Sequence, residues 1–181
     1  MAETLNRRPP SVTVRSWLAP EPAAARFSLR GGADAVAAAS VAFGVALPTT
    51  ACRAASTGSR SALWLGPDEH LLIAPEADHA TVASALASGL AGVANSLVDV
   101  SHRQVAFSVH GPHAAWLLNS GCPLDLDLSA FPVGMCTRTL FTKAEILLWR
   151  TGPESFRIEV WRSFAEYVVG LLDEAARELS T

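Results

Sequence analysis

The densest group of polar side chains in this 181-residue sequence lies between Asp99 and Arg103 and contains Asp99, Ser101 and His102. Aspartate, serine and histidine form the catalytic triad of many hydrolases, in which the histidine bonds to both partners. On a strand, however, Asp99 and Ser101 point to one face of the sheet and His102 points to the other. The spacing therefore favours a structural role, in which Asp99 and Ser101 satisfy backbone groups at the entrance to a strand.

Two histidines, His110 and His113, are three residues apart, which is a spacing that occurs in metal sites. No third ligand follows at a convincing spacing, and His113 comes directly after Pro112, which suits the first position of a helix. We interpret His113 as a surface residue near a helix start. A metal site at these two histidines stays as an alternative, which the zinc content of the purified protein tests.

Three cysteines and two aspartates are weaker candidates for chemistry. Cys52, Cys122 and Cys136 form no Cys-x-x-Cys pair, their number is odd, and none has a neighbour that would activate a thiol. A disulfide scaffold is not expected, and the reducing cytoplasm is the default location. Asp125 and Asp127 alternate with leucines, which is typical of a solvent-facing edge. We assign no catalytic, cofactor-binding or metal-binding residue to this chain.

Composition narrows the class of protein. Hydrophobic residues make up 50% of the chain, which is enough to bury a core and excludes wholesale disorder. The formal net charge of −3 lacks the basic excess of a nucleic-acid binder. No apolar run reaches the roughly 18 residues of a membrane span, and residues 1–10 lack the apolar core of a signal peptide. We expect a cytoplasmic protein with no nucleic-acid or membrane partner.

Two stretches of the chain resemble each other at a distance of 80 residues. Phe-Ser-Leu-Arg-Gly at 27–31 is similar to Phe-Ser-Val-His-Gly at 107–111, and an apolar helical stretch follows each, over 33–43 and 112–118. Such a recurrence is the signature of an internal repeat. The sequence therefore indicates a duplicated unit that begins with a strand and a helix.

The repeat continues with a hairpin and a second helix. Gly-Pro turns at Gly66 and Gly152 each separate two apolar runs, so the flanking strands should pair antiparallel. One closing helix is predicted to start at Asp78 as its N-cap, and the other at a capping box from Ser163 to Glu166.

The repeated pattern predicts an α+β fold with two related halves. Each half would have an antiparallel sheet with helices packed on it. We expect a flexible arm over residues 1–24, a first half over 25–96 and a second half over 97–181. The two halves would be packed closely as one globular unit.

The segment from Leu97 to Leu118, with Asp-Val-Ser-His at 99–102 and Gly-Pro-His-Ala at 111–114, resembles the folate-binding aminomethyltransferase superfamily, which includes the glycine-cleavage T-protein. The continuation is similar more narrowly to the gamma subunit family of heterotetrameric sarcosine oxidase. It reads Gly-Cys-Pro-Leu-Asp-Leu over 121–126. The resemblance covers about residues 25–178.

The resemblance implies the fold of the aminomethyltransferase folate-binding domain and membership of a cytoplasmic complex with alpha, beta and delta subunits. That complex oxidatively demethylates sarcosine to glycine, produces hydrogen peroxide and passes the one-carbon unit to tetrahydrofolate. The resemblance also implies that FAD, FMN and NAD bind to the larger subunits, zinc to delta and folate to alpha, with no cofactor in this chain.

The chain departs from the T-protein pattern where folate chemistry would occur. T-proteins carry a catalytic aspartate after the leucine-rich helix, whereas residues 118–121 here contain no carboxylate. T-proteins also have a glycine-rich loop before the next strand, and residues 141–146 leave almost no room for such a loop here. We therefore expect a structural subunit without an active site of its own. The alternative is a stand-alone folate-dependent aminomethyl transferase or a folate-binding regulator.

Tryptophans are the candidate contacts with other subunits, because aromatic residues dominate interface energetics. Trp17, Trp149 and Trp161 are the candidates, and the last two are expected to belong to the core instead.

Overall fold

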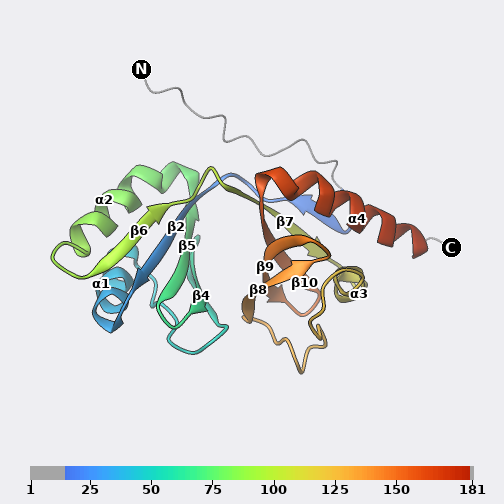
Figure 1. The fold of residues 1–181 in the computed structure, drawn as a ribbon, viewed down its shortest axis with the longest axis horizontal. Coiled ribbons are helices and arrows are strands. Elements are labelled where there is room, and N and C mark those ends of the chain that lie inside the picture. The colour runs from blue at the N-terminus through green and yellow to red at the C-terminus, as the bar shows by residue number, and fades with distance from the viewer. Residues whose placement is uncertain (1–14, 180–181) are drawn as a thin grey trace, which may run out of the picture. The chain divides into compact units, whose positions relative to one another are not determined.

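The structure is a computed structural model that describes residues 15–179 (Figure 1). Over these residues the chain forms two compact units, which we call the first half (Ala23–Ser101) and the second half (residues 15–22 with those from His102 onward). No helix in the described range is long and apolar enough to cross a membrane. The elements are β1 (Leu18–Pro20), β2 (Ala24–Gly31), α1 (Ala33–Phe43), β3 (Ala54–Thr57), β4 (Arg60–Gly66), β5 (Glu69–Pro75), η1 (Glu76–Asp78), α2 (His79–Gly89), β6 (Asn95–Asp99), β7 (Gln104–His110), α3 (Ala114–Asn119), β8 (Cys136–Phe141), β9 (Ala144–Gly152), β10 (Ser155–Trp161), η2 (Arg162–Phe164) and α4 (Ala165–Glu178).

The first half is an antiparallel sheet with one face covered by α1 and α2. Its strand order is β3-β4-β5-β2-β6. Alternate residues of β2, among them Phe27 and Leu29, enter a core that the two helices complete. The helices approach closely, because a Cβ at Gly89 would lie only 2.7 Å from the Cβ of Ala42.

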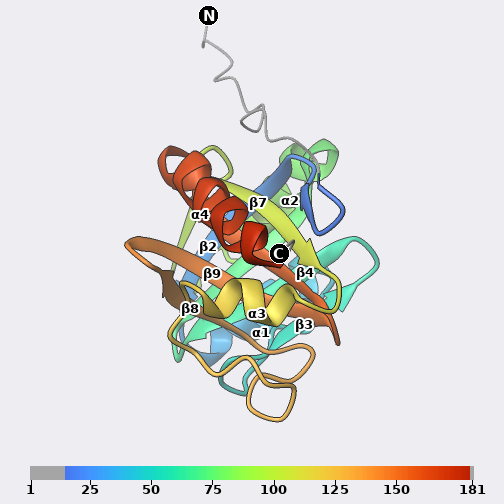
Figure 2. The same cartoon turned by 90° about the vertical axis from the view of Figure 1, so that its right-hand side faces the viewer.

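The second half repeats this arrangement. Its strand order is β8-β9-β10-β7-β1, so that each strand from β7 to β10 takes the place of its counterpart from β2 to β5. Figure 2 shows α3 and α4 on the same face of this sheet, and residues of both helices share a core with the strands. The α+β fold with two antiparallel sheets is confirmed. Each sheet has five strands, two more than the three of the repeated pattern. In the first half, β3 was missed because it is short and its residues are half-buried or exposed, so that it lacks a clear apolar pattern.

The Gly-Pro turns lie where the sequence predicts them. Residues 67 and 68 join β4 to β5, and residues 153 and 154 join β9 to β10. Next to the first turn, Trp64 pairs with His70 across the strands. Next to the second turn, Arg150 pairs with Phe156. These two pairs therefore occupy equivalent places in the two halves.

The start of the described chain is not a loose arm. Leu18 is fully buried, and its strand β1 pairs with β7 at the edge of the second sheet. Arg15 binds both carboxylate oxygens of Asp173 on α4, at 2.7 and 2.6 Å. The expectation of a flexible arm is therefore wrong for residues 15–24, since β7 supplies an open edge and apolar cover; residues 1–14 lie outside the described range. The halves also divide at Ala23 and Ser101 instead of at 25 and 96.

The predicted helix caps are not formed. Asp78 does precede α2, but its carboxylate pairs with Arg60 (Nη2 to Oδ2, 3.3 Å) and makes no cap bond. The capping box at Ser163 and Glu166 is wrong, because the single turn η2 precedes α4 and no side chain caps the helix. At Asp78 the neighbouring Arg60 guanidinium takes the carboxylate that would cap α2. At Ser163 the tighter turn η2 lies where the capping box would begin the helix.

A buried guanidinium organises the long segment that joins α3 to β8. Arg150 is 4% exposed, and its Nη1 donates to the carbonyls of Leu126 (3.0 Å) and Phe131 (2.8 Å). Its Nη2 donates to the carbonyl of Pro153 at 2.6 Å, and its charge lies 4.6 Å from the ring centre of Phe156. Backbone carbonyls that would otherwise be buried without partners are thus satisfied by one side chain.

We expect Arg150→Met to lower the free energy of unfolding by about 2–4 kcal/mol, because it leaves several carbonyls unpaired in the interior. Chemical denaturation measures this difference. The matched control is Arg177→Met, since Arg177 is exposed on α4 and its ion pair is with the exposed Glu174. The control should change stability by less than about 0.5 kcal/mol. Equal effects of the two substitutions would contradict the role given to Arg150.

We expect Leu18→Ala to destabilise the protein by about 2–4 kcal/mol, because it opens a cavity in the core beneath β1. The nearby Ser16→Ala serves as the control, since Ser16 is exposed. Thermal unfolding of both variants checks the comparison. An unchanged midpoint for Leu18→Ala would show that β1 does not contribute to the folded second half.

Candidate functional site

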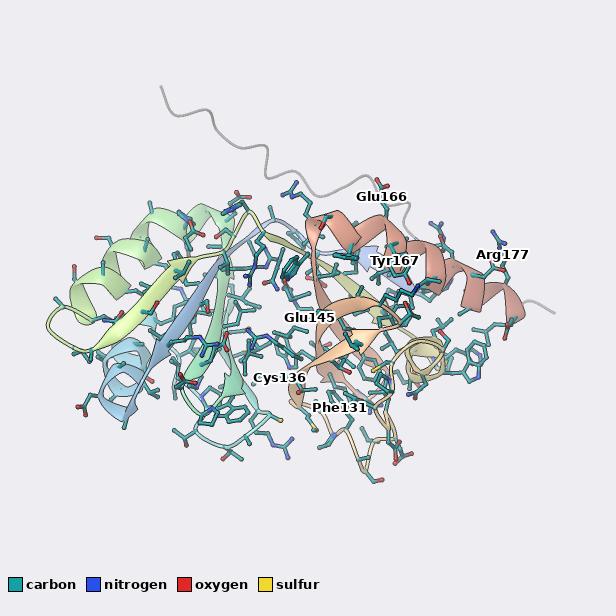
Figure 3. All side chains as sticks on the ribbon, viewed as in Figure 1. Phe131, Cys136, Glu145, Glu166, Tyr167 and Arg177 are labelled. Carbon is teal, nitrogen blue, oxygen red and sulfur yellow. The ribbon has the colours of Figure 1, made fainter. Side chains whose placement is uncertain are left out.

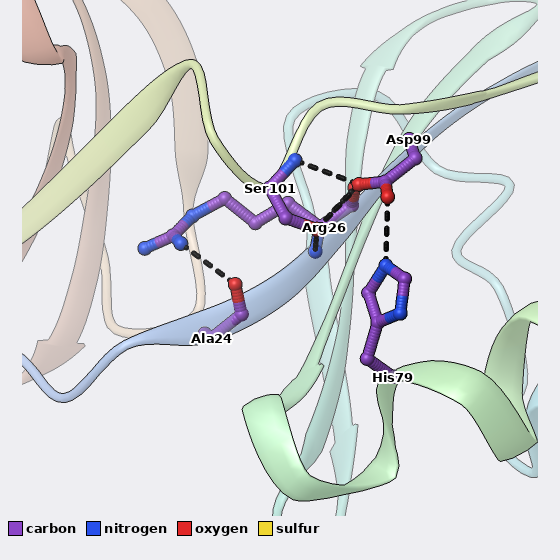
Figure 4. Close-up of polar contacts among 5 residues, drawn as sticks. All are labelled: Ala24, Arg26, His79, Asp99 and Ser101. Atoms are coloured by element: carbon purple, nitrogen blue, oxygen red, sulfur yellow. Dashed lines mark hydrogen bonds and ion pairs between the residues drawn. The ribbon is translucent and has the colours of Figure 1, made fainter. Parts of the chain in front are cut away.

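The Asp99 cluster lies at the end of β6 (Figure 4). Asp99 is the last residue of β6, so Ser101 and His102 lie in the turn that follows and not on a strand. Oδ1 of Asp99 accepts hydrogen bonds from the Ser101 amide (2.9 Å) and hydroxyl (2.5 Å). Its Oδ2 lies 2.7 Å from Nε2 of His79, which comes from the first turn of α2. The histidine of the cluster is therefore His79, not His102.

The order of the three groups excludes triad chemistry at Ser101. A triad needs the histidine between the serine and the carboxylate, so that the imidazole can take the hydroxyl proton. In this cluster the carboxylate of Asp99 lies between Ser101 and His79. The Ser101 hydroxyl donates to Asp99 and accepts from the Arg26 amide at 2.9 Å. The arrangement is a structural clamp.

The clamp fixes the first strand of the half to the turn after its last strand. The Arg26 amide donates to the Ser101 hydroxyl, and the Arg26 carbonyl accepts from the Val100 amide at 2.9 Å. The ring of His79 stacks on Phe27, with centroids 5.4 Å apart. His79 is not recognisable from the sequence as a member of the cluster, because it lies 20 residues from Asp99 and no local pattern links the two.

The environment of Asp99 shifts its acidity. Burial raises the pKa of its carboxyl, but hydrogen bonds from the hydroxyl and amide of Ser101, together with the contact with His79, outweigh it. The net result is a pKa below the ordinary 3.8. The ionised carboxylate is therefore the form that the folded clamp prefers.

The other histidines do not gather a ligand set. His110 lies on β7 and His113 precedes α3, and both line a cavity of about 360 Å³ together with Trp17. Within residues 15–179, no group of three or more histidine, cysteine, aspartate or glutamate side chains is placed to hold a metal ion. His113 is exposed, consistent with a surface residue near a helix start.

The cysteines are free thiols, and the alternating aspartates belong to a turn. All three cysteines are free thiols, and Cys136 is fully buried at the start of β8. The Asp125 carboxylate accepts from the Asp127 amide, and Asp127 accepts from the amide and hydroxyl of Ser129. These Ser129 bonds lower the pKa of Asp127. The two aspartates therefore shape a turn.

A buried ion pair on β10 was not anticipated. Glu159 is fully buried, and its Oε1 lies 2.9 Å from Nε of Arg157. Arg157 also donates from Nη1 to Glu21 at 2.9 Å. Residues two apart on a strand share a face, so the Arg-x-Glu spacing was the available signal.

Exposed aromatic side chains gather at the junction of β10 and α4. Trp161, Phe164 and Tyr167 are 42%, 39% and 40% exposed. The Tyr167 hydroxyl lies 2.8 Å from that of Thr142, and Figure 3 labels Tyr167 on α4. The expectation that Trp161 belongs to the core is wrong, because it ends its strand with the Arg103 guanidinium 5.6 Å from its ring centre.

We expect Asp99→Asn to remove a pH-dependent part of the stability. The lowered pKa of Asp99 means that its contribution is fully present above the unfolded value of 3.8 and is lost as pH falls through the folded value. The stability difference between wild type and Asp99→Asn should therefore be constant near neutral pH and shrink below about pH 4. Chemical denaturation from pH 2.5 to 7 measures this difference, with Asp34→Asn as the control, since Asp34 is exposed in the first turn of α1. A stability difference that does not depend on pH would contradict the prediction.

Sequence comparisons agree on one family. The chain matches the model of the sarcosine oxidase, gamma subunit family over residues 30–178. It is 36% identical over 151 residues to sarcosine oxidase subunit gamma of Corynebacterium sp. (strain P-1), which covers 83% of this chain and 73% of the relative. Its identity to the Arthrobacter sp. subunit is 34% over 151 residues, with the same coverage.

Solved structures share the fold. A chain of heterotetrameric sarcosine oxidase from Corynebacterium sp. U-96 has a TM-score of 0.85 and 34% identity, covering 91% of this chain and 85% of that one. The glycine cleavage system aminomethyltransferase T of Bartonella henselae has a TM-score of 0.67 at 13% identity, covering 86% and 44%, which shows the fold alone. The resemblance found in the sequence is confirmed, and the chain belongs to the sarcosine oxidase gamma subunit family.

Proposed function

We propose that this chain acts as a non-catalytic subunit that holds a heterotetrameric sarcosine oxidase together. The observation that carries the proposal is the family match, which extends across both halves of the chain. The complex would oxidise sarcosine to glycine and peroxide and transfer the one-carbon unit to tetrahydrofolate. The alpha, beta and delta subunits of that complex would be the partners of this chain. The complex would be located in the cytoplasm.

The residues after α3 do not fit folate chemistry. Where T-proteins have a catalytic aspartate, Asn119 donates from Nδ2 to the carbonyls of Cys122 (3.3 Å) and Leu124 (2.6 Å). Ser120 donates to the carbonyl of Leu117 at 2.6 Å. These donors close the helix end and its turn, and residues 118–121 place no carboxylate there. We derive no folate step for this chain and assign FAD, FMN, NAD, tetrahydrofolate and zinc to the other subunits.

The connection between β8 and β9 supports the same conclusion. Only Thr142 and Lys143 separate the strands, and Thr142 adopts a positive φ of 53° in this tight turn. A glycine-rich loop of the T-protein kind has no counterpart here. This short turn supports a fold that is used without the folate site of T-proteins.

The exposed aromatic cluster of Trp161, Phe164 and Tyr167 is the surface that best suits a subunit contact. Aromatic side chains are enriched at the centres of interfaces. Arg103 beside Trp161 adds the cation that is also enriched there. Glu166, the neighbour of Tyr167 in the sequence, projects from α4 (Figure 3) and could belong to a polar rim.

The first test is an affinity purification of the tagged chain from its native cells. We expect larger, flavin-absorbing chains to co-elute and to produce peroxide when sarcosine is added. A colourless protein that elutes alone and binds tetrahydrofolate would overturn the proposal and favour the one-carbon transferase alternative.

We expect the double substitution Phe164→Ser and Tyr167→Ser to weaken retention of the other subunits at least tenfold, because aromatic anchors contribute about 1–4 kcal/mol each to an interface. Co-elution at graded concentrations measures the retention. The control is Val41→Ser, since Val41 is 86% exposed on α1. Thermal unfolding of the variants separates loss of binding from loss of folding, and undiminished co-elution of the folded double variant would exclude this surface.

A further inference from the structure

The strand β6 forms one edge of the first sheet. Within residues 15–179 it pairs with β2 alone, in a regular register from Asn95 opposite Gly31 to Asp99 opposite Phe27. Four of its five residues are exposed, and the side chain of Val98 is 50% exposed. Figure 1 shows β6 beside α2 in the first half. The outer side of β6 is therefore an exposed strand edge.

The ladder between β2 and its neighbours shows which backbone groups of β6 point outward. The Gly31 amide donates to the Asp68 carbonyl, so the odd-numbered residues of β2 bond to β5 and the even-numbered residues bond to β6. The bond from the Val100 amide to the Arg26 carbonyl agrees with this alternation. The amides and carbonyls of three residues of β6 consequently point outward, and within residues 15–179 they bond to no other residue. These residues are Asn95, Leu97 and Asp99.

The other edges of the two sheets carry features that deter pairing with another chain. Proteins protect open edges with very short strands, proline or charged side chains. β1 has three residues and ends at Pro20, β3 has four residues, and β8 carries the exposed Arg138. β6 contains no proline, lysine or arginine, and its register with β2 has no bulge. Its one charged residue, Asp99, lies at the end of the strand with its carboxylate bound to Ser101 and His79.

The helix beside β6 adds no charge to this edge. α2 follows the strand along its length, since His79 at the helix start lies 2.7 Å from the Asp99 carboxylate and the Leu90 carbonyl at the helix end accepts from Asn95 at 3.3 Å. No aspartate, glutamate, lysine or arginine occurs over 79–98, although such residues make up 17% of the chain. The exposed side chains of α2 are small, and include those of Thr81, Ser84, Ala87 and Ser88. A second chain that approaches this edge meets no like charge from α2.

We propose that two copies of this chain pair through β6, antiparallel to each other around a two-fold axis at Leu97. Each Leu97 exchanges two backbone hydrogen bonds with Leu97 of the other copy, and each Asn95 does so with Asp99 of the other copy. The edge fits a second copy because this register pairs every outward group and sets each Asp99 opposite an uncharged residue. A shift of the axis to Asp99 would set two carboxylates opposite each other, and a shift to Asn95 would leave Asp99 unpaired.

The dimer does not depend on the subunit role proposed above. β6 and α2 belong to the first half, whereas the aromatic cluster of Trp161, Phe164 and Tyr167 belongs to the second. Self-association of the purified chain tests the dimer, and co-elution of other subunits tests the subunit role. Failure of one proposal is therefore distinguishable from failure of the other.

The register provides the test, because Ser96 of one copy lies directly opposite Val98 of the other. Ser96→Lys with Val98→Lys sets like charges opposite each other and should weaken the dimer at least tenfold. Ser96→Glu with Val98→Lys sets opposite charges at the same positions and should retain the dimer. The control, Ala37→Lys with Val41→Lys, adds the same charge at exposed positions of α1 and should also retain it. Sedimentation of the purified full chain between about 1 and 200 μM measures the dimer, and thermal unfolding shows that each variant is folded.

Hydrogen exchange gives a second measurement on the unchanged chain. The amides of Leu97 and Asp99 should exchange slowly at the concentrations that favour the dimer and faster on dilution, because only the second copy protects them. The Val98 amide bonds to β2 and should exchange at the same rate at both concentrations, which makes it the internal control.

Four results would overturn the proposal. The first is a chain that stays monomeric at about 200 μM. The second is a dimer that Ser96→Lys with Val98→Lys leaves intact, which would show that the contact lies on another surface. The third is equal loss of the dimer in the Lys–Lys and Glu–Lys variants, which would exclude the register centred on Leu97. The fourth is exchange of the Leu97 amide that does not depend on concentration.

Discussion

The equivalent strands β2 and β7 need hydrogen-bond partners on both edges, and the rest of the fold follows from how this need is met. In the first half β2 lies between β5 and β6, and the chain reaches β6 directly after α2. In the second half β7 lies between β10 and β1, but β1 comes from the start of the described chain. An open edge in the interior would leave a row of unpaired backbone groups. The short strand from Leu18 to Pro20 therefore completes a unit whose other elements begin more than 80 residues later.

At the hairpin end of each half, a different side chain binds the backbone of a neighbouring segment. In the second half the Arg150 guanidinium binds the carbonyls of an incoming segment and lies against Phe156. In the first half the His70 imidazole binds one carbonyl, that of Pro48, and the shorter segment brings in no ring. The same topology thus packs the Phe131 ring against Phe156 in one half, whereas a cavity of about 570 Å³ lies beside His70 in the other.

The Asp99 cluster shows how a conspicuous motif can serve the fold. Its carboxylate gathers Ser101 and His79, and Ser101 in turn binds the Arg26 backbone. This set of hydrogen bonds joins β2 to the turn after β6. The same residues in a different order along the hydrogen-bond path would have been a candidate catalytic group, which is why geometry and not residue type decides the interpretation.

Local patterns in the sequence were enough to predict the repeat, the Gly-Pro hairpins and the helix over 33–43. The family resemblance was also present in the sequence, because motifs such as the one over 121–126 are contiguous. Contacts between distant residues were not predictable in this way: His79 beside Asp99, β1 beside β7, and the Arg60 ion pair that takes Asp78 from its cap. Hydrophobic spacing reports which face of an element is buried, whereas the partner of a polar group depends on segments that only the tertiary structure brings together. The sequence by itself determined the repeated elements and the family, and the tertiary structure decided the clamp and the outer strands of the two sheets.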